Sequence, residues 1–260
     1  MKDYRIFLID LDGTVYRGDE TVESGVRFVH RLADAKKDYL FLTNNTTRTP
    51  QMVVDKLKGH GIETDTAHVY TPSMATASYI LQRNHQKKIG LYIIGEIGLW
   101  SEMLSHPEFE INEKNPDYVI VGMDRDLTYH KVRVATRAIR NGATFIGTNA
   151  DLNLPLGDEL IPGNGAQCAM VAAASGQNPL YIGKPESIIV EMALAKVGHT
   201  KDEAIIVGDN YDTDIRAGFN STVDQLLTLT GVTQKQDIVG KKQPTILVNN
   251  LDELNYEKKY

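Results

Sequence analysis

Short apolar runs, most of them closed by polar or turn-forming residues, recur along the chain and predict buried β-strands. The runs with this pattern span residues 6–9, 38–43, 88–94, 117–123, 143–148, 179–182, 204–207, 224–229 and 245–248. Apolar residues at helical spacing lie between many of them, over residues 23–35, 49–58, 129–140 and 165–175, and in a segment that ends at Gly198. Because strands alternate with helices, the pattern predicts an α/β protein with parallel sheets.

The same pattern predicts two domains. A length of 260 residues allows one large or two modest domains. Residues 76–178 contain strands and helices of their own and read as an inserted block. We therefore expect a doubly wound, Rossmann-like parallel-sheet core formed by residues 1–75 and 179–260, with an inserted α/β domain over residues 76–178.

Two carboxylates, Asp10 and Asp12, directly follow the first apolar run, and Gly13 comes next. The carboxyl end of a parallel strand is where open α/β sheets bind ligands. Residues two apart on an extended chain point the same way, so the two carboxylates should repel each other unless a cation or proton lies between them. Mg²⁺ prefers such oxygen ligands together with phosphate. A lone aspartate there would more often form a turn. The pair predicts a metal-assisted phosphate site.

Two further strand ends carry groups that suit phosphate. Thr43, Asn44 and Asn45 follow the second strand and offer a hydroxyl and two amides, which bind phosphate oxygens without adding negative charge. These residue types also favour loops for their own sake. Lys184 follows the strand at 179–182, and an ammonium is a compact charge that binds phosphate.

The strand at 204–207 leads into a third group of acidic residues. Asp209 is placed to complete an oxygen cage for Mg²⁺ with the two N-terminal aspartates. Asp214 is expected to support the cage from behind. Asp212 is expected to be a surface charge near a helix start.

Composition and net charge limit the classes of partner that we expect this protein to bind. The net charge is −6, which predicts no nucleic-acid surface but leaves room for a nucleotide pocket. No apolar run approaches the roughly 18–20 residues that span a bilayer, so no membrane partner is expected. Cys168 is the only cysteine, which excludes an intrachain disulfide, and it lies in an apolar run typical of a core. Asp3 and Asp10 interrupt the N-terminal apolar stretch, so we expect no signal peptide and a cytoplasmic location.

A glycine-rich segment, residues 161–165, precedes the helical pattern at 165–175. A tight turn before a helix and an anion site at the helix N-terminus are both compatible with it, and the turn is favoured. It matches neither a dinucleotide-binding fingerprint nor a P-loop.

The four motifs DLDGT, FLTNN, GKP and GDNYDTD, in this order, resemble those of the haloacid dehalogenase (HAD) superfamily. The long insert between the second and third motifs resembles the NagD-like branch, which carries a large α/β cap. The segments GTNADLNLP and IPGNG also look like motifs of that cap. The resemblance implies a HAD core and a Mg²⁺-dependent phosphomonoester phosphatase that acts through an aspartyl-phosphate.

The resemblance also implies a role for each residue. Asp10 would be the nucleophile and Asp12 the general acid and base. Mg²⁺ would be held by the Asp10 side chain, the Asp12 backbone carbonyl and the Asp209 carboxylate. The groups implied to bind phosphate are Thr43, Asn44, Asn45 and Lys184, and those implied to support the site from behind are Gly13, Asn210 and Asp214. Because Asp12 is present, dehalogenase activity is not expected.

The substrate class stays open among small phosphorylated metabolites, either nucleoside monophosphates or sugar and polyol phosphates. Specificity is expected on the cap, around Asp124, Asn149 and residues 151–155. Leu154 stands where relatives that act on pyridoxal phosphate tend to carry a histidine, which argues against that substrate. The partner is a small phosphomonoester. The oligomeric state stays open, with a homodimer as one option because caps of this kind often pair.

Two other functions are weighed against the phosphatase. A non-catalytic phosphate-binding or regulatory protein would be favoured by loss of Asp10, Asp12 or Asp209, and all three are present. A phosphotransferase would carry a small helical cap after the first motif, and only residues 18–24 separate that motif from the next helical pattern.

Overall fold

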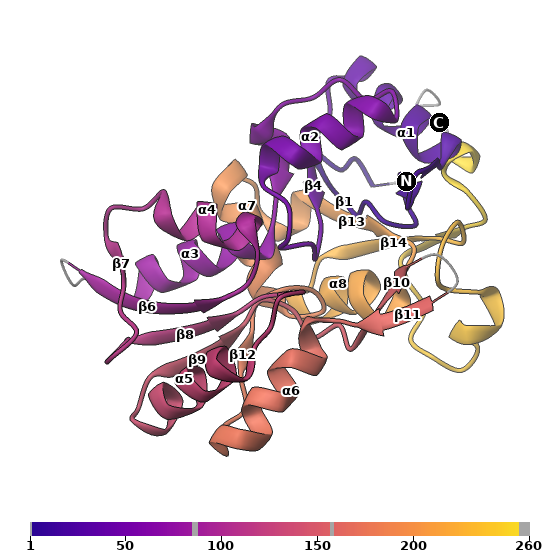
Figure 1. The fold of residues 1–260 in the computed structure, drawn as a ribbon. Helices are drawn as coiled ribbons and strands as arrows, with labels where there is room; N and C mark the ends of the chain where they lie inside the picture. Colours follow the sequence, from indigo (N-terminus) through magenta and orange to yellow (C-terminus); the bar gives the residue numbers. More distant parts are fainter. Residues whose placement is uncertain (1, 85–87, 157–158, 255–260) are drawn as a thin grey trace. The chain divides into compact units, whose positions relative to one another are not determined.

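The computed structural model describes residues 2–84, 88–156 and 159–254 and divides into two compact units (Figure 1). The first unit consists of Met1–Thr43, Gln51–Tyr70 and Lys184–Tyr260, and the second of Asn44–Pro50 and Thr71–Gly183. The predicted insert, residues 76–178, lies inside the last of these ranges. The short segment Asn44–Pro50 belongs to the second unit although it interrupts the first.

The sheet of the first unit contains six strands in the order β15-β14-β13-β1-β4-β5, and every neighbouring pair is parallel. The strand bounds are β1 (Ile6–Ile9), β4 (Asp38–Leu42), β5 (Val69–Tyr70), β13 (Ala204–Gly208), β14 (Asp224–Thr228) and β15 (Ile246–Val248). In the register of the sheet, Ile9 pairs with Val207 on one side and with Phe41 on the other. The segments that follow β1, β4 and β13 therefore start level with one another at one edge of the sheet.

The first unit buries both faces of this sheet, which explains why its strands are continuous apolar runs and not alternating ones. Its helices are α1 (Glu23–Asp34), α2 (Pro50–Gly59), α7 (Ser187–Val197) and α8 (Arg216–Ser221). Figure 1 shows α1 on one side of the sheet and α8 on the other. All four residues of β1 are buried, and Phe7 packs edge-on against Phe28 of α1 with ring centroids 5.9 Å apart.

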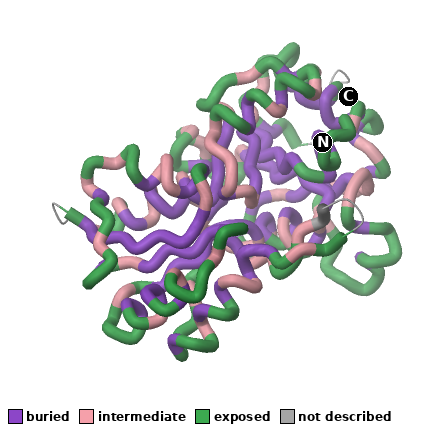
Figure 2. The backbone as a smooth tube through the Cα atoms, in the orientation of Figure 1, coloured by how far each residue is buried: buried purple, intermediate pink, exposed green. Residues whose placement is uncertain are grey.

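The second unit has its own parallel sheet, in the order β12-β9-β8-β6-β7. Its strands are β6 (Ile89–Ile94), β7 (Phe109–Ile111), β8 (Tyr118–Val121), β9 (Thr144–Gly147) and β12 (Leu180–Tyr181). Its helices are α3 (Pro72–Arg83), α4 (Ile97–Leu104), α5 (Tyr129–Arg140) and α6 (Asn164–Ser175). Figure 1 shows α3 and α4 on one side of this sheet and α5 and α6 on the other. Figure 2 shows that its central strands are buried while the outer faces of its helices are exposed.

Shorter elements complete both units. Antiparallel hairpins are formed by β2 (Tyr16–Arg17) with β3 (Glu20–Thr21), and by β10 (Asn153–Leu156) with β11 (Glu159–Pro162). Short 3₁₀ turns occur at Thr66–His68, Lys201–Glu203, Lys235–Ile238 and Leu251–Glu253, and a π-helical turn at Tyr211–Ile215. Within the described ranges, no helix combines the length and the apolar character that a membrane crossing requires.

The predicted fold class, an α/β protein with a doubly wound parallel sheet and an inserted α/β unit, is confirmed. The sequence analysis did not predict the hairpins, β5, β7, α3 or α4. The hairpins and β5 have two to four residues per strand, so their apolar period is too short to recognise. The α3 helix did carry a start signal, because Thr71 caps it and Pro72 is its first residue.

Candidate active site

Three buried carboxylates meet at the carboxyl edge of the first unit's sheet. Asp10 directly follows β1, Asp209 directly follows β13, and Asp214 lies in the π-helical turn Tyr211–Ile215. One carboxylate oxygen from each lies within 4.8 Å of the other two. These residues are 8%, 0% and 1% exposed, so water screens the repulsion between their negative charges only weakly.

Lys184 supplies the positive charge of this cluster. Its Nζ lies 2.5 Å from Asp10 Oδ1 and 2.7 Å from Asp214 Oδ1, and it donates a third hydrogen bond, of 2.8 Å, to the carbonyl of Leu42 at the end of β4. A side chain that the sequence assigned to phosphate is thus also the counter-ion of two carboxylates.

The charges of the cluster do not balance when every group is ionised. Burial and then the charge of Asp214 raise the pKa of Asp10 well above its usual range, although Lys184 opposes the shift. The same two causes raise the pKa of Asp209 to about 7. Burial alone would lower the pKa of Lys184, but the charges of Asp10 and Asp214 raise it. Three carboxylates share one ammonium, so the donor set fits a hard divalent cation such as Mg²⁺.

Asp209 is held tightly by its neighbours. Its Oδ2 accepts a 2.6 Å hydrogen bond from the amide of Val232, and its Oδ1 accepts a 3.3 Å bond from the hydroxyl of Thr14. Gly13 has φ of +94°, and a Cβ there would lie 2.3 Å from Asp209 Oδ2. Only glycine fits this position, because a side chain would collide with a carboxylate and strain the backbone.

The GDNYDTD motif folds around Asp214. The amide of Asn210 donates a 3.1 Å hydrogen bond to Asp214 Oδ2, and its side-chain oxygen accepts a 3.0 Å bond from the amide of Asp212. Asp212 itself is exposed, as the sequence predicted. Asp214 lies within the carboxylate cluster, because the tight turn brings its side chain back to the strand end.

Asp12 has a different environment from Asp10. Strand β1 ends at Ile9, and the following turn is closed by a 2.7 Å hydrogen bond from the amide of Gly13 to the carbonyl of Tyr16. The alternation of an extended strand therefore does not reach Asp12, whose side chain is exposed while that of Asp10 is buried. Among the described residues, the third carboxylate of the cluster is that of Asp214 and not that of Asp12.

The polar segment after β4 is divided between the two units. Thr43 is buried in the first unit, and its amide donates a 3.4 Å hydrogen bond to the carbonyl of Tyr70. Asn44 belongs to the second unit, where its side-chain amide donates to Asp151 at 3.0 Å and its carbonyl accepts from the Asn149 side chain at 2.9 Å. Two residues that the sequence grouped together thus belong to different compact units.

Asn45 also belongs to the second unit, and its side chain stabilises the turn in which it lies. Its side-chain oxygen accepts hydrogen bonds from the amides of Thr47 and Arg48, at 3.0 and 3.1 Å. Side-chain bonds of this type are the usual reason for asparagine in turns. These hydrogen bonds give Asn45 a structural role in the turn.

Asp124, one of the expected specificity residues, is held by a lysine of the second unit. Asp124 is 3% exposed and lies 2.7 Å from the ammonium of Lys131. In the segment 161–165, Gly163 passes so close to the carbonyl of Asp151 that a Cβ would lie 2.2 Å from it. The segment runs from β11 through Gly163, whose backbone is extended, into α6, so the predicted helix start is present. Of residues 151–155, the side chain of residue 155 lies outside the described residues.

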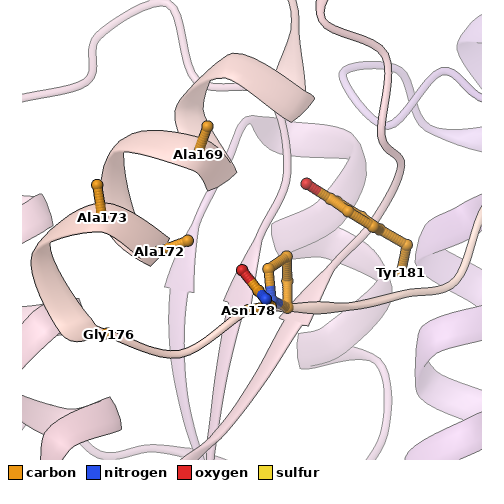
Figure 3. A pocket seen from close by; sticks show the side chains of 7 residues that line it. Ala169, Ala172, Ala173, Gly176, Asn178 and Tyr181 are labelled. Atoms are coloured by element: carbon orange, nitrogen blue, oxygen red, sulfur yellow. The ribbon is translucent and has the colours of Figure 1, made fainter.

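Two other features of the second unit carry no catalytic group. Cys168 is buried, and burial raises the pKa of its thiol to about 12, so it is a core residue and not a nucleophile. An open hollow of about 540 Å³ lies beside the carboxyl half of α6, with a lining that includes Ala169, Ala172, Asn178 and Tyr181 (Figure 3). No carboxylate or lysine lines it.

The sequence analysis missed the loop after β14, which supplies the backbone donor to Asp209. This loop contains Thr230, Gly231, Val232 and Thr233. The available signal was its position, because a polar, glycine-containing segment directly follows a core strand at the same sheet edge as the other motifs. Thr14, which also contacts Asp209, belongs to the DLDGT motif but was given no role.

Models of protein families match two stretches of the chain. Residues 7–106 match haloacid dehalogenase-like hydrolase, and residues 181–254 match a family described as HAD-hydrolase-like. Among curated proteins, the chain is 44% identical to the 5'-nucleotidase YutF of Bacillus subtilis (strain 168), covering 97% of this chain and 98% of that protein. It is 40% identical to an acid sugar phosphatase of Staphylococcus epidermidis, covering 94% and 93%.

Comparison with solved structures also finds relatives that match nearly the whole chain. A double mutant of thermostable NPPase from Geobacillus stearothermophilus is 44% identical and superposes with a TM-score of 0.91, covering 98% of this chain and 99% of that one. NagD from E. coli K-12 is 32% identical with a TM-score of 0.90, covering 97% and 98%. The chain therefore belongs to the haloacid dehalogenase-like hydrolases. Within that family it is a NagD-like protein, and its enzyme class is that of the HAD-type phosphatases.

Proposed function

We propose that this enzyme is a Mg²⁺-dependent phosphatase of small phosphomonoesters and that it acts through an aspartyl-phosphate on Asp10. The observation that carries the proposal is the buried contact of Asp10 with Lys184, beside Asp209 and Asp214. A carboxylate held by a lysine at the edge of a parallel sheet is positioned and desolvated as a nucleophile requires. Membership in the HAD-type phosphatases supports the same chemistry.

In the first step, a carboxylate oxygen of Asp10 attacks the phosphorus of the ester. A bond forms between that oxygen and phosphorus, and the bond between phosphorus and the ester oxygen breaks. Asp12, as general acid, gives its proton to the departing oxygen, which leaves as the alcohol. The exposure of the Asp12 side chain supports this role, because a general acid must exchange protons with substrate and water.

In the second step, Asp12 has become a carboxylate and takes a proton from water. The water oxygen attacks the same phosphorus, and the bond between phosphorus and Asp10 breaks. Inorganic phosphate leaves, Asp10 is again a carboxylate and Asp12 is again protonated. One water is consumed for each ester cleaved, so atoms and charges balance over the cycle.

The metal is proposed to be held by Asp10, Asp209 and the backbone carbonyl of Asp12. When bound, Mg²⁺ offsets the negative charge of the carboxylates and of the phosphoryl group. Lys184 and Thr43 are proposed to bind phosphoryl oxygens, and Asp214 to hold Lys184 through their 2.7 Å contact.

The substrate is proposed to be a nucleoside monophosphate or a sugar phosphate. This rests on the names of two relatives that cover nearly the whole chain, a 5'-nucleotidase and an acid sugar phosphatase. Phosphate binding by Asn44 and Asn45, selection of the leaving group by the second unit and the cytoplasmic location stay predictions of the sequence, and a homodimer stays one option.

The activity is tested by measuring phosphate release from a panel of phosphomonoesters, with Mg²⁺ and with EDTA. The panel contains an aryl phosphate, nucleoside monophosphates, sugar phosphates, glycerol phosphate and pyridoxal phosphate. Metal-dependent release is expected, with a nucleotide or a sugar phosphate as the best natural ester. No release from any ester by folded, Mg²⁺-binding protein would contradict the proposal and favour a phosphate-binding protein.

The intermediate is tested with Asp12→Asn, which keeps the nucleophile but lacks the general base. After rapid acid quench, mass spectrometry is expected to find one phosphoryl group on the peptide that contains Asp10. Asp10→Asn should show neither label nor turnover, while the exposed Asp212→Asn should retain both. A label on another residue, or full turnover by Asp10→Asn, would contradict the assignment.

A further inference from the structure

The loop after β14 reaches the candidate site because of the sheet register. Leu227 of β14 pairs with Gly208 of β13, so the residues after Thr228 begin beside Asp209. The amide of Val232 donates to Asp209 Oδ2 at 2.6 Å. This loop, residues 229–233, therefore contacts the carboxylate cluster at this sheet edge.

The loop and the Asp209 segment are joined at several points. The amide of Thr233 donates to the Asp209 carbonyl at 3.1 Å, and its hydroxyl accepts a 2.8 Å hydrogen bond from the amide of Tyr211. A Cβ on Gly231 would lie 1.9 Å from Asp209 Oδ2. Backbone and carboxylate are therefore packed against each other with no room between them.

Thr230 joins this loop to the segment that carries Asp12. Its hydroxyl donates a 2.8 Å hydrogen bond to the carbonyl of Gly13. Its own carbonyl accepts hydrogen bonds from Nε of Arg17, at 2.7 Å, and from Nη2 of the same guanidinium. Arg17 is exposed on the β2–β3 hairpin and lies 213 residues away in sequence.

We propose that Thr230, anchored by Arg17, is a positioning residue that fixes the separation between the Asp209 carboxylate and the backbone at Asp12 and Gly13. The inference rests on the proposed function, in which Asp209 and the Asp12 backbone both hold Mg²⁺. Thr230 contacts neither substrate nor metal in this scheme. Groups that orient metal ligands typically change metal affinity or activity about 10–100-fold when removed.

The main variant is Thr230→Val, which keeps the shape of the side chain and removes only the hydroxyl. Mg²⁺ is titrated into the metal-free protein by calorimetry, so the readout does not depend on turnover. The dissociation constant of Mg²⁺ is expected to rise about tenfold, the lower end of the range for orienting groups. In kinetics, the Mg²⁺ concentration for half-maximal rate should rise equally, while KM for the ester stays within about twofold.

Two further variants act as controls. Thr230→Ser restores the hydroxyl and is expected to bind Mg²⁺ within about twofold of the parent enzyme. Thr245→Val removes a threonine hydroxyl near the other end of β14, where it contacts Asp224 and Gln225, and should leave Mg²⁺ binding unchanged. Equal weakening by Thr245→Val would contradict a specific role of Thr230.

The anchoring role of Arg17 is tested with Arg17→Gln, alone and combined with Thr230→Val. Arg17→Gln is expected to weaken Mg²⁺ binding about threefold, and the double variant should bind no more weakly than Thr230→Val alone. Such non-additivity is the mark of two residues that act through one contact. If Thr230→Val does not fold, Arg17→Gln alone decides, and unchanged Mg²⁺ binding would overturn the inference.

The outcomes separate this inference from the proposed function. If the parent enzyme binds Mg²⁺ and Thr230→Val binds it equally well, only the positioning role is overturned. If either variant raises KM for the ester and leaves Mg²⁺ binding unchanged, the residues contact substrate and the inference is again overturned. If the parent enzyme neither binds Mg²⁺ nor releases phosphate, both the proposed function and the inference fail.

Discussion

At the scale of single residues, Lys184 determines the charge balance of the candidate site. It is 2% exposed and is shared between Asp10 and Asp214. Buried ion pairs add little net stability compared with apolar packing, but removing one partner leaves an unpaired buried charge. The sequence indicated this lysine by its position after a strand, whereas its two partners became apparent only in the folded chain.

Replacing Lys184 by Met is therefore expected to lower both stability and activity. The free energy of unfolding should fall by about 3–5 kcal/mol, because two buried carboxylates lose their counter-ion. Phosphate release should fall at least about tenfold. Urea unfolding followed by circular dichroism, with parallel rate measurements, checks both effects.

The matched control is Lys201→Met. Lys201 makes an ion pair of 3.1 Å with Glu191, but both side chains are more than 40% exposed. Exposed pairs contribute about 0–1 kcal/mol, so this variant should remain close to the parent enzyme in stability and rate. A Lys184→Met variant that behaved like the control would contradict the central place of Lys184.

At the scale of elements, the site depends on how close three strand-end segments come to one another. Gly13, Gly208 and Gly231 each leave less than 2.5 Å between an added Cβ and a carboxylate oxygen of Asp209 or Asp214. Real Cβ contacts are never this short, so each glycine lets backbone approach a carboxylate directly. The segments around the ends of β1, β13 and β14 are packed so closely that an added methyl group would not fit between backbone and carboxylate.

Gly231→Ala is expected to displace Asp209 and to lower phosphate release about 10–100-fold, as loss of a metal-orienting contact does. Gly59→Ala is the control, since no atom lies within 4 Å of an added Cβ and the residue is in α2. That change should stabilise the protein by about 0.5–1 kcal/mol, because alanine is the better helix former. Steady-state kinetics and thermal unfolding of both variants provide the measurement. Unaltered turnover in Gly231→Ala would show that the loop can move without effect.

At the scale of the whole molecule, each compact unit has a hydrophobic core of its own, and the carboxylate cluster belongs to one of the two units. The carboxylate cluster belongs to the first unit, whose core includes Phe7, Phe28 and Leu226. The second unit has a core of its own, which includes Val119 and Phe145. A ligand of the cluster therefore acts directly on only one of the two cores.

Adding Mg²⁺ at about one hundred times its dissociation constant should stabilise the first unit by about 2.7 kcal/mol. Amides in β1 and β13 that exchange by unfolding of that unit should then exchange about 100-fold more slowly, whereas β8 and β9 should change little. Hydrogen exchange followed by mass spectrometry, with and without EDTA, measures this difference.

Asp209→Asn serves as the control for the metal effect, because it removes a proposed ligand and reduces the buried negative charge. It is expected to abolish the slowing caused by Mg²⁺. Equal protection of β1 and β8 would show that the two cores unfold together, and protection that persists in Asp209→Asn would place the ion elsewhere.

The sequence alone determined the α/β class, most of the longer strands and helices, and the positions of the motifs at strand ends. Apolar periodicity reports which residues leave water, and strands that are buried on both faces show it as continuous runs. Asp10 was recognised because it directly follows such a run, and Asp209 and Lys184 because each follows one after a single glycine. Short elements such as β5 and the hairpins have too few residues to show a period.

Only the tertiary structure decided which of these residues meet. Strand order places β13 beside β1 and β14 beside β13, although nearly 200 residues separate β1 from β13 in sequence, and apolar periodicity does not encode that order. Asp214 in the cluster, the loop at Thr230 that contacts Gly13, and the separation of Thr43 from Asn44 all follow from the packing of distant segments. The sequence thus defined the chemical groups of the candidate site, whereas their distances, burial and charge balance depend on the folded chain.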